Sequence, residues 1–304
     1  MLYNTLTQAI GNTPLVHIPF SKYAAIYAKL EYLNPGGSIK DRSALYMIEQ
    51  AEKNGSLQPN GTIIDASSGN HGIAVAMIGA QRGYKVIICV SDKISKEKQD
   101  TLRAYGAQLM VCPSTLFLED PQSYHSKAMQ LHKEIPGSIM LNQYFNTQNR
   151  DAHYHSLGAE IWRQTGGKIT HFFAGAGTGG TISGAGLYLK EKNPAIQIMA
   201  VDSVHSWYST QGNPKPYKLE GLGIDFNSPV LMRSTIDHVL PVTDEESISM
   251  LKQLAQQYGI LVGPSSGAVA AAVAAYENQL PDNAFAVMIF GDSGRAYLTK
   301  DFYQ

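Results

Sequence analysis

A loop runs directly into a helix in the stretch Asn34-Pro35-Gly36-Gly37-Ser38-Ile39-Lys40-Asp41-Arg42-Ser43-Ala44. Asparagine, proline and a glycine pair are typical of a loop, and the pattern predicts a helix over 42–54 with Ser38 as its N-cap. Asp41 suits the first turn, but Lys40 faces the positive end of the helix dipole. That position disfavours the ammonium and favours a neutral, nucleophilic amine. A solvated lysine is the alternative, and the stretch alone does not exclude it.

Strands and helices alternate along the rest of the chain. Short apolar strands followed by helices predict parallel sheets covered on both faces, with ligands beyond the carboxyl ends of the strands. Residues 203–235 show no strong period and predict a long loop, which in a compact domain is usually functional. The predicted strands are 15–18, 25–30, 62–66, 85–90, 108–112, 138–142, 171–174, 197–202, 236–242 and 284–289, and the later helices are 73–82, 95–105, 123–134, 153–164, 182–192, 244–258 and 268–278.

A glycine-rich segment, Gly175-Ala176-Gly177-Thr178-Gly179-Gly180-Thr181, lies between a predicted strand and a predicted helix. We call it the glycine loop. Its glycines expose successive backbone N–H groups at a helix start, where they bind phosphate well. The same glycines match the dinucleotide fingerprint GxGxxG, and Asp202 follows at about the expected distance. A nicotinamide-dependent oxidoreductase is therefore the alternative, although it leaves Lys40 without a role.

A second segment, Ser67-Ser68-Gly69-Asn70-His71-Gly72, also follows a predicted strand, and we call it the asparagine loop. Its hydroxyls, amide and backbone N–H groups predict a site for a carboxylate, and Asn70 could also hydrogen-bond a phenolic oxygen. Ser265, within Gly263-Pro264-Ser265-Ser266-Gly267, precedes another predicted helix and could contact a ring nitrogen. Helix capping is the alternative for both segments.

Composition narrows the classes of function. The 304 residues have a formal net charge of −1, with 44% hydrophobic and 16% charged residues, which predicts a globular protein that binds neither nucleic acid nor a membrane. There is no signal-peptide pattern, so we expect a cytoplasmic protein. Cys89 and Cys112 lie in apolar segments and are predicted to be buried thiols. Cysteines and histidines, including His153, lack metal-site spacing, so no metal is expected.

An amine, a phosphate cradle, a carboxylate cradle and a ring-facing hydroxyl together fit pyridoxal phosphate. The chain resembles the fold-type II pyridoxal-phosphate enzymes of the cystathionine β-synthase and cysteine synthase (O-acetylserine sulfhydrylase) family. The resemblance runs from Gly11-Asn12-Thr13-Pro14 to Asp292-Ser293, with its motifs in the same order. It implies an α/β fold like that of tryptophan synthase β, with two doubly wound lobes and pyridoxal 5'-phosphate between them.

The same resemblance assigns roles to the segments. Lys40 would form the internal aldimine and act as the catalytic base, and Asn70 would bind the 3′-oxygen of the cofactor. Ser265 would face the pyridine nitrogen. The phosphate would be bound by Gly177, Thr178, Gly179, Gly180 and Thr181. The α-carboxylate of the substrate would be bound by Ser67, Ser68, Asn70, His71 and Gln143.

The implied reaction is β-replacement on serine or O-acetylserine through an aminoacrylate intermediate, to which a thiol adds. Resemblance to cystathionine β-synthase favours serine and homocysteine as substrates. Ile224 stands where that enzyme usually has Tyr, and His71 stands where both enzymes usually have Thr, so cysteine synthesis from O-acetylserine and sulfide stays open. The stretches closest to cystathionine β-synthase are 141–144, 152–154, 220–226 and 292–300.

The resemblance also implies a domain organisation. A smaller mobile N-terminal lobe would contain residues 35–145 with about 1–12, and a larger lobe 146–304 with about 13–34. Closure of the smaller lobe would exclude water from the site. We expect a homodimer that acts on small-molecule amino-acid and thiol substrates. The chain leaves no room for the haem segment and the regulatory domains of the animal enzymes, so neither haem nor adenosylmethionine control is expected.

Overall fold

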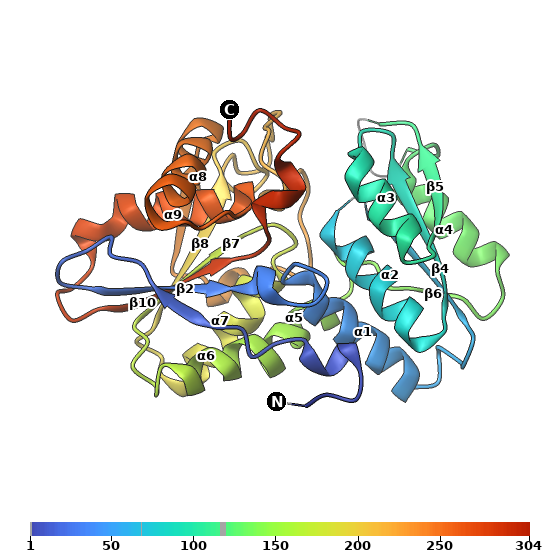
Figure 1. Ribbon diagram of the computed structural model, residues 1–304, viewed down its shortest axis with the longest axis horizontal. Helices are drawn as coiled ribbons and strands as arrows, with labels where there is room; N and C mark the ends of the chain where they lie inside the picture. Colours follow the sequence, from blue (N-terminus) through green and yellow to red (C-terminus); the bar gives the residue numbers. More distant parts are fainter. Residues whose placement is uncertain (1, 68, 116–119) are drawn as a thin grey trace. The chain divides into compact units, whose positions relative to one another are not determined.

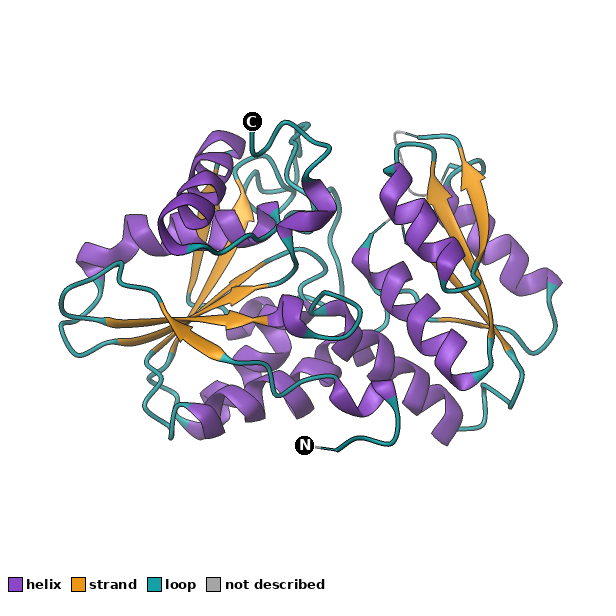
Figure 2. Ribbon diagram, viewed as in Figure 1, coloured by secondary structure: helices purple, strands orange, loops and turns teal. Residues whose placement is uncertain are grey.

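The computed structural model describes residues 2–67, 69–115 and 120–304, which form two compact units (Figure 1). The first unit contains the residues up to Ile10 together with Asn34–Gln148, and the second contains Gly11–Leu33 and Asn149–Gln304. Strands and helices alternate in both units (Figure 2). The predicted α/β class is confirmed, whereas mobility of the smaller lobe stays a prediction.

The first unit contains a four-stranded parallel sheet with strand order β5-β4-β3-β6. Neighbouring residues in a strand point to opposite faces, so Ile63 and Ile88 pack with α1 and α2, whereas Ile64 and Cys89 pack on the face that carries α4. Helices on both faces explain why these strands are mostly apolar. The elements are η1 Leu6–Ala9, α1 Lys40–Lys53, β3 Thr62–Ala66, α2 Asn70–Arg82, β4 Lys85–Ser91, α3 Lys96–Ala104, β5 Gln108–Cys112, α4 Tyr124–Glu134 and β6 Ile139–Met140.

The second unit contains a six-stranded sheet with strand order β1-β2-β10-β7-β8-β9. All neighbouring strands are parallel except β1 and β2. These two are antiparallel, unlike the predicted parallel sheets, because a short connection joins them and parallel pairing needs a crossover of a dozen residues or more. Its core includes Phe173, Met199 and Met288, packed with Leu251 and Val269. The strands are β1 Leu15–His17, β2 Ala25–Leu30, β7 His171–Gly175, β8 Gln197–Ser203, β9 His238–Val242 and β10 Phe285–Phe290.

The helices of the second unit include one interruption. The predicted helix 153–164 is three consecutive pieces, of which the middle one is a π-helical turn. A Cβ on Gly158 in that turn would lie 2.8 Å from the Cβ of Tyr188, so the turn packs closely on α7. The helical elements are η2 Glu31–Leu33, α5 Gln148–His153, π-turn η3 Tyr154–Gly158, α6 Ala159–Gln164, α7 Gly180–Lys192, η4 Arg233–Thr235, α8 Asp244–Tyr258, α9 Pro264–Tyr276, η5 Glu277–Gln279 and η6 Gly294–Tyr297.

Five helices begin earlier than the sequence predicts, including the predicted helix 153–164, whose first piece α5 begins at Gln148. α1 begins at Lys40 with Ile39 at the N-cap position, so the prediction of Ser38 as N-cap is wrong, although its Oγ accepts the Lys40 N–H at 3.2 Å. Helices α2, α7 and α9 likewise begin inside segments that were predicted to be loops. Glycine and proline obscured these starts, because both residues also occur in the first turn of a helix. Within the described residues, no helix has the length and apolar character needed to span a membrane.

Candidate functional site

Lys40 is the first residue of α1 and follows the turn Gly36-Gly37. The Asp41 carboxylate accepts a hydrogen bond from the Gly36 N–H at 2.6 Å, which ties the turn to the start of the helix. A Cβ on Gly36 would have to displace that carboxylate, and Gly37 has a φ of +83°, which favours glycine. The lysine is therefore held at the positive end of the helix dipole, as the sequence predicts.

The asparagine loop joins the end of β3 to the first turn of α2. The Ser67 hydroxyl accepts the backbone N–H groups of Gly72 at 3.0 Å and Gly69 at 3.4 Å. The Gln143 side-chain amide reaches the same hydroxyl at 3.5 Å, so the fold brings together two predicted carboxylate ligands that are 76 positions apart. Asn70 is the first residue of α2, after an N-cap glycine with no side-chain cap. The predicted ligand Ser68 lies outside the described residues.

His71 pairs with a residue that the sequence analysis did not single out. Its Nε2 lies 3.2 Å from Oδ2 of Asp65, and both side chains are buried. The other Asp65 oxygen accepts the backbone N–H of Asn142 at 3.0 Å, next to Gln143. Asp65 therefore connects the two segments that carry the predicted carboxylate ligands. Its position in an apolar strand was the available signal, because a buried carboxylate normally has a partner.

The glycine loop leads from β7 into α7. A Cβ on Gly177 would lie 2.7 Å from the carbonyl oxygen of Gly221, and a Cβ on Gly179 would lie 2.6 Å from the Cβ of Leu231. Gly179 also has a φ of +90° and is the N-cap of α7, and the Thr178 hydroxyl accepts the Gly180 N–H at 3.4 Å. A helix start built from glycine carries no side chains that would keep an anion away from its backbone N–H groups, which fits a phosphate group.

Helix α5 supports the glycine loop from one side. The Asn149 side-chain amide donates to the Thr178 hydroxyl at 3.0 Å, and both side chains are buried. The Thr181 hydroxyl lies 3.3 Å from Nε2 of His153, which is also buried. No local sequence pattern reveals Asn149 or this role of His153, because the two contacts cross 29 and 28 positions of the chain. The two threonines predicted to bind phosphate are thus held by side chains of α5.

Ser265 lies in the first turn of α9. The prediction that it precedes the helix is wrong, because α9 begins at Pro264 and not at residue 268. A Cβ on Gly221 would lie 3.6 Å from the Ser265 hydroxyl, and Gly221 has a φ of +77°. Gly221 therefore lies next to Gly177 and also next to Ser265. The fold brings the predicted phosphate ligands and the predicted ring partner together in the second unit.

The predicted site residues thus form two groups, one in each unit. Lys40, Ser67, Asn70, His71 and Gln143 belong to the first unit, and the glycine loop and Ser265 belong to the second. In each group the N-cap residue of a helix is a glycine, Gly69 or Gly179, which supplies no side-chain cap of its own. Such helix starts fit the anionic groups of pyridoxal phosphate and an amino acid. The individual roles of these residues stay predictions.

Comparison with known proteins shows where the chain belongs. The model of a family described as pyridoxal-phosphate dependent enzyme matches residues 6–292. Cystathionine beta-synthase of Apis mellifera is 46% identical over 301 residues, which are 96% of this chain but 60% of that protein, so the chain spans less than two thirds of this relative. Cysteine synthase of Helicobacter pylori is 38% identical over 100% of this chain and 99% of that protein. A crystal structure of an O-acetylserine dependent cystathionine beta-synthase from Helicobacter pylori matches with a TM-score of 0.93 and 38% identity over 100% of both chains.

The nicotinamide interpretation of the glycine loop finds no support. The matching family model is that of pyridoxal-phosphate dependent enzymes, and its range of residues 6–292 includes the loop. The Asp202 carboxylate, which follows the fingerprint at about the expected distance, accepts the Ser203 N–H at 2.9 Å and the Ser209 hydroxyl at 2.8 Å. Burial raises the pKa of this carboxyl group in spite of those hydrogen bonds. Asp202 is therefore engaged by its own segment of the chain.

The family confirms the predicted cofactor, pyridoxal phosphate, and the glycine-rich helix starts are consistent with it. The solved structure that matches over its full length confirms the predicted fold-type II architecture. A homodimer and a cytoplasmic location stay predictions. The chain belongs to the family of pyridoxal-phosphate dependent enzymes, in the group that contains cystathionine β-synthase and cysteine synthase.

Proposed function

We propose that the protein catalyses a β-replacement that joins a thiol to the three-carbon skeleton of serine or O-acetylserine. The observation that carries the proposal is the grouping of the glycine loop, Gly221 and Ser265 in the second unit. When bound, pyridoxal phosphate supplies an electron sink for the α-carbon of the substrate. A neutral hydroxyl such as Ser265 need not keep the ring nitrogen protonated, so the sink is modest. A modest sink suits elimination and addition at the β-carbon.

Lys40 is the proposed catalytic residue. Its amine would hold the cofactor and, once freed by the bound amino acid, would take the α-proton and return it. The position of Lys40 at the start of α1 supports this role, because the positive end of a helix favours a neutral amine. Asn70 would bind the 3′-oxygen of the cofactor. The substrate carboxylate would be bound by Ser67, Ser68, Asn70, His71 and Gln143.

The proposed product is cystathionine, with homocysteine as the thiol and O-acetylserine as the faster donor. Acetate leaves the β-carbon without help, whereas hydroxide must be protonated, for which the Lys40 ammonium is the candidate acid. The name of the Helicobacter pylori structure that covers the whole chain supports O-acetylserine as the donor. Serine, the donor that the sequence pattern favours, is then the slower substrate.

Cysteine synthesis from O-acetylserine and sulfide is the second candidate. Ile224 stands at a position where the resemblance to cystathionine β-synthase predicts a tyrosine near the second substrate. The Ile224 side chain is buried and apolar, and it offers no polar group to the amino and carboxyl groups of homocysteine. Sulfide has no such groups to recognise, so this residue favours the second candidate.

A matrix of four substrate pairs tests the proposal. The holoenzyme is incubated with serine or O-acetylserine and with homocysteine or sulfide, and the products are quantified by mass spectrometry. We expect cystathionine from homocysteine, faster with O-acetylserine, and a rate at least about 100-fold lower in Lys40→Ala. Lys53→Ala, at the exposed end of the same helix, is the matched control and should keep its activity.

The outcomes separate the candidates. Cysteine as the dominant product would establish the second candidate instead. A protein that shows the visible absorption of a lysine-bound cofactor, but gives no product from any pair, would overturn β-replacement as the reaction. Full activity of Lys40→Ala would overturn the role proposed for the lysine.

A further inference from the structure

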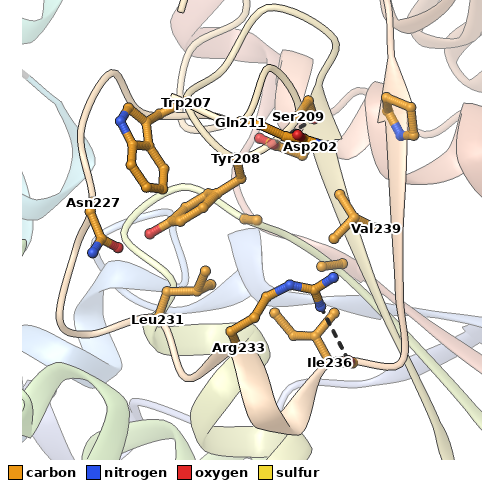
Figure 3. A pocket seen from close by; sticks show the side chains of 13 residues that line it. Asp202, Trp207, Tyr208, Ser209, Gln211, Asn227, Leu231, Arg233, Ile236 and Val239 are labelled. Carbon is orange, nitrogen blue, oxygen red and sulfur yellow. Dashed lines mark hydrogen bonds between the residues drawn. The ribbon is translucent and has the colours of Figure 1, made fainter. Parts of the chain in front are cut away.

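A cavity of about 600 Å³ lies within the second unit, under the long irregular segment 203–235 (Figure 3). The sequence analysis predicts a function for this segment, and the site described above uses only its residues near Gly221. The volume falls in the range of about 300–1,000 Å³ that is typical of small-molecule sites. The lining residues are Ala176, Ala200, Asp202, Trp207, Tyr208, Ser209, Gln211, Asn227, Leu231, Arg233, Ile236, Val239 and Pro241.

The cavity follows from the way the edge of the sheet is covered. Helix α7 packs on the beginning of β8, where a Cβ on Gly186 would lie 3.0 Å from Ile198. Ala200 and Asp202 follow on the same face of β8 and pair with Val239 and Pro241 of the edge strand β9. Side chains as small as alanine and proline leave space there, and the irregular segment covers the space instead of a helix. Cavities at the carboxyl ends of parallel strands are common ligand sites.

Aromatic and apolar groups meet one positive charge in this cavity. The rings of Trp207 and Tyr208 are 5.4 Å apart in an edge-to-face arrangement, and Ile236 and Val239 add apolar surface. Arg233 donates one N–H to the Ile236 carbonyl at 3.2 Å, and the other N–H groups of its guanidinium can still bind a ligand. Figure 3 shows its side chain at the end of the cavity away from Asp202.

Asp202 does not compete for the same ligand group. Its carboxylate is buried and accepts three hydrogen bonds, from the hydroxyls of Ser206 and Ser209 and from the Ser203 N–H. An anion would therefore bind at Arg233, and the body of the ligand would extend along Trp207 and Tyr208.

The walls of the cavity also contact the glycine loop. The Tyr208 hydroxyl accepts the Ser228 N–H at 3.2 Å, and the Ser228 hydroxyl donates to the carbonyl of Thr178 at 3.1 Å. Leu231 packs directly on Gly179, and Ala176 of the glycine loop lines the cavity itself. A ligand that moves Tyr208 or Leu231 would displace the backbone that faces the cofactor phosphate.

We propose that this cavity is a second ligand site, which binds a small aromatic carboxylate and is coupled to the glycine loop. The carboxylate pairs with Arg233, and the ring packs on Trp207 and Tyr208. The ligand acts as an effector, because none of the residues that hold it is a predicted substrate or cofactor ligand. Binding at this site does not depend on the reaction proposed above, so its test and the test of the reaction can fail separately.

Calorimetric titration of the holoenzyme with 2-naphthoate tests the binding site, and 2-naphthamide is the uncharged matched probe. We expect saturable binding of the carboxylate, with the amide at least about tenfold weaker. Arg233→Gln should weaken 2-naphthoate by about tenfold or more and leave 2-naphthamide unchanged. Arg103→Gln, an exposed arginine of the first unit, is the control variant and should bind as the unmodified protein does.

Phosphorus NMR of the holoenzyme tests the coupling. The resonance of the cofactor phosphate should shift when 2-naphthoate is added. Tyr208→Phe removes the oxygen that accepts the Ser228 N–H, so this variant should bind 2-naphthoate but show a smaller shift. An unchanged phosphate resonance at saturation would overturn the coupling. No saturable binding of 2-naphthoate, or equal binding of the two probes to the unmodified protein, would overturn the site, and this comparison needs no variant.

Discussion

The asparagine loop and the glycine loop have the same plan, a strand that ends in a short turn at the start of a helix, but their interiors differ. Behind the asparagine loop lies a buried pair of ionisable side chains, Asp65 and His71. Behind the glycine loop the backbone packs so closely that a Cβ on Gly177 would overlap the Gly221 carbonyl. Gly72 of the asparagine loop also packs closely, since a Cβ there would lie 2.9 Å from the Ser67 carbonyl oxygen. The asparagine loop therefore combines one such glycine with side chains that can be exchanged, whereas the glycine loop has several closely packed glycines.

The largest expected difference between the two loops comes from replacing one glycine in each of them with alanine. Gly177→Ala places a methyl group 2.7 Å from a backbone oxygen, which cannot move as a flexible side chain can. We expect a loss of about 2–3 kcal/mol in cofactor affinity or in stability, measured by cofactor titration and thermal unfolding. Gly69→Ala is the matched control, because its Cβ would meet no atom within 4 Å and its φ is −138°. Equal effects of the two changes would contradict the packing argument.

A double-mutant cycle on the ionisable pair should give the next largest effect. Asp65→Asn keeps an oxygen for the Asn142 N–H but removes the charge that faces His71. We expect KM for the amino-acid substrate to rise about tenfold, with a smaller change in kcat, because Asp65 positions the carboxylate ligands. Cofactor affinity should not change, in contrast to Gly177→Ala.

His71→Thr completes the cycle. If Asp65 acts through the imidazole, Asp65→Asn should change KM much less in the His71→Thr background, with a coupling of about 1 kcal/mol or more. Steady-state kinetics of the four proteins measure this coupling. Simple additivity of the two changes would show that Asp65 acts through Asn142 alone.

A smaller effect is expected from the side chain that supports the glycine loop. Asn149→Ala removes the amide that donates to the buried Thr178 hydroxyl at 3.0 Å. One buried hydrogen bond contributes about 1 kcal/mol, so cofactor affinity should fall by about fivefold. Titration with the cofactor measures the change, and Asn213→Ala on the exposed irregular segment is the control. A cofactor affinity equal to that of the unmodified protein would show that Asn149 of α5 does not support the predicted phosphate ligands.

The smallest effect is expected from the Cys89 thiol. Cys89 adjoins the asparagine loop, because its backbone carbonyl accepts the Ser67 N–H at 3.1 Å. Burial raises the pKa of the Cys89 thiol from 9.0 to about 12. The unfolded thiol ionises near pH 9 and the folded one does not, so its contribution to stability is present below pH 9 and is lost as the pH rises towards 12. In a Cys112→Ser variant at pH 8, a thiol reagent should label Cys89 only as fast as the protein opens, and denaturant should accelerate labelling. Fast labelling of the folded protein would contradict the burial of this thiol.

Local patterns predicted most of the fold. The strand 62–66 and the helix 244–258 have the predicted bounds, because apolar periodicity and turn residues act over a few positions. The starts of α2 and α7 were missed because their first turns are built from the same residues that end a loop. The order of strands around β10 could not be derived from the sequence, since it depends on which distant strands pair.

The sequence by itself determined that an amine, two helix starts and a hydroxyl would follow strands, because glycine, serine and lysine reveal such positions locally. Only the tertiary structure decided that Asp65 faces His71, that Gly221 lies between the glycine loop and Ser265, and that a cavity adjoins Tyr208. The physical reason is range. Backbone propensities act between neighbours in the chain, whereas ion pairs, close backbone approaches and cavities depend on how side chains and distant segments pack. Asp65 and His71 are close in the chain but lie in different elements, and Asp65 also bonds Asn142, which is 77 positions away.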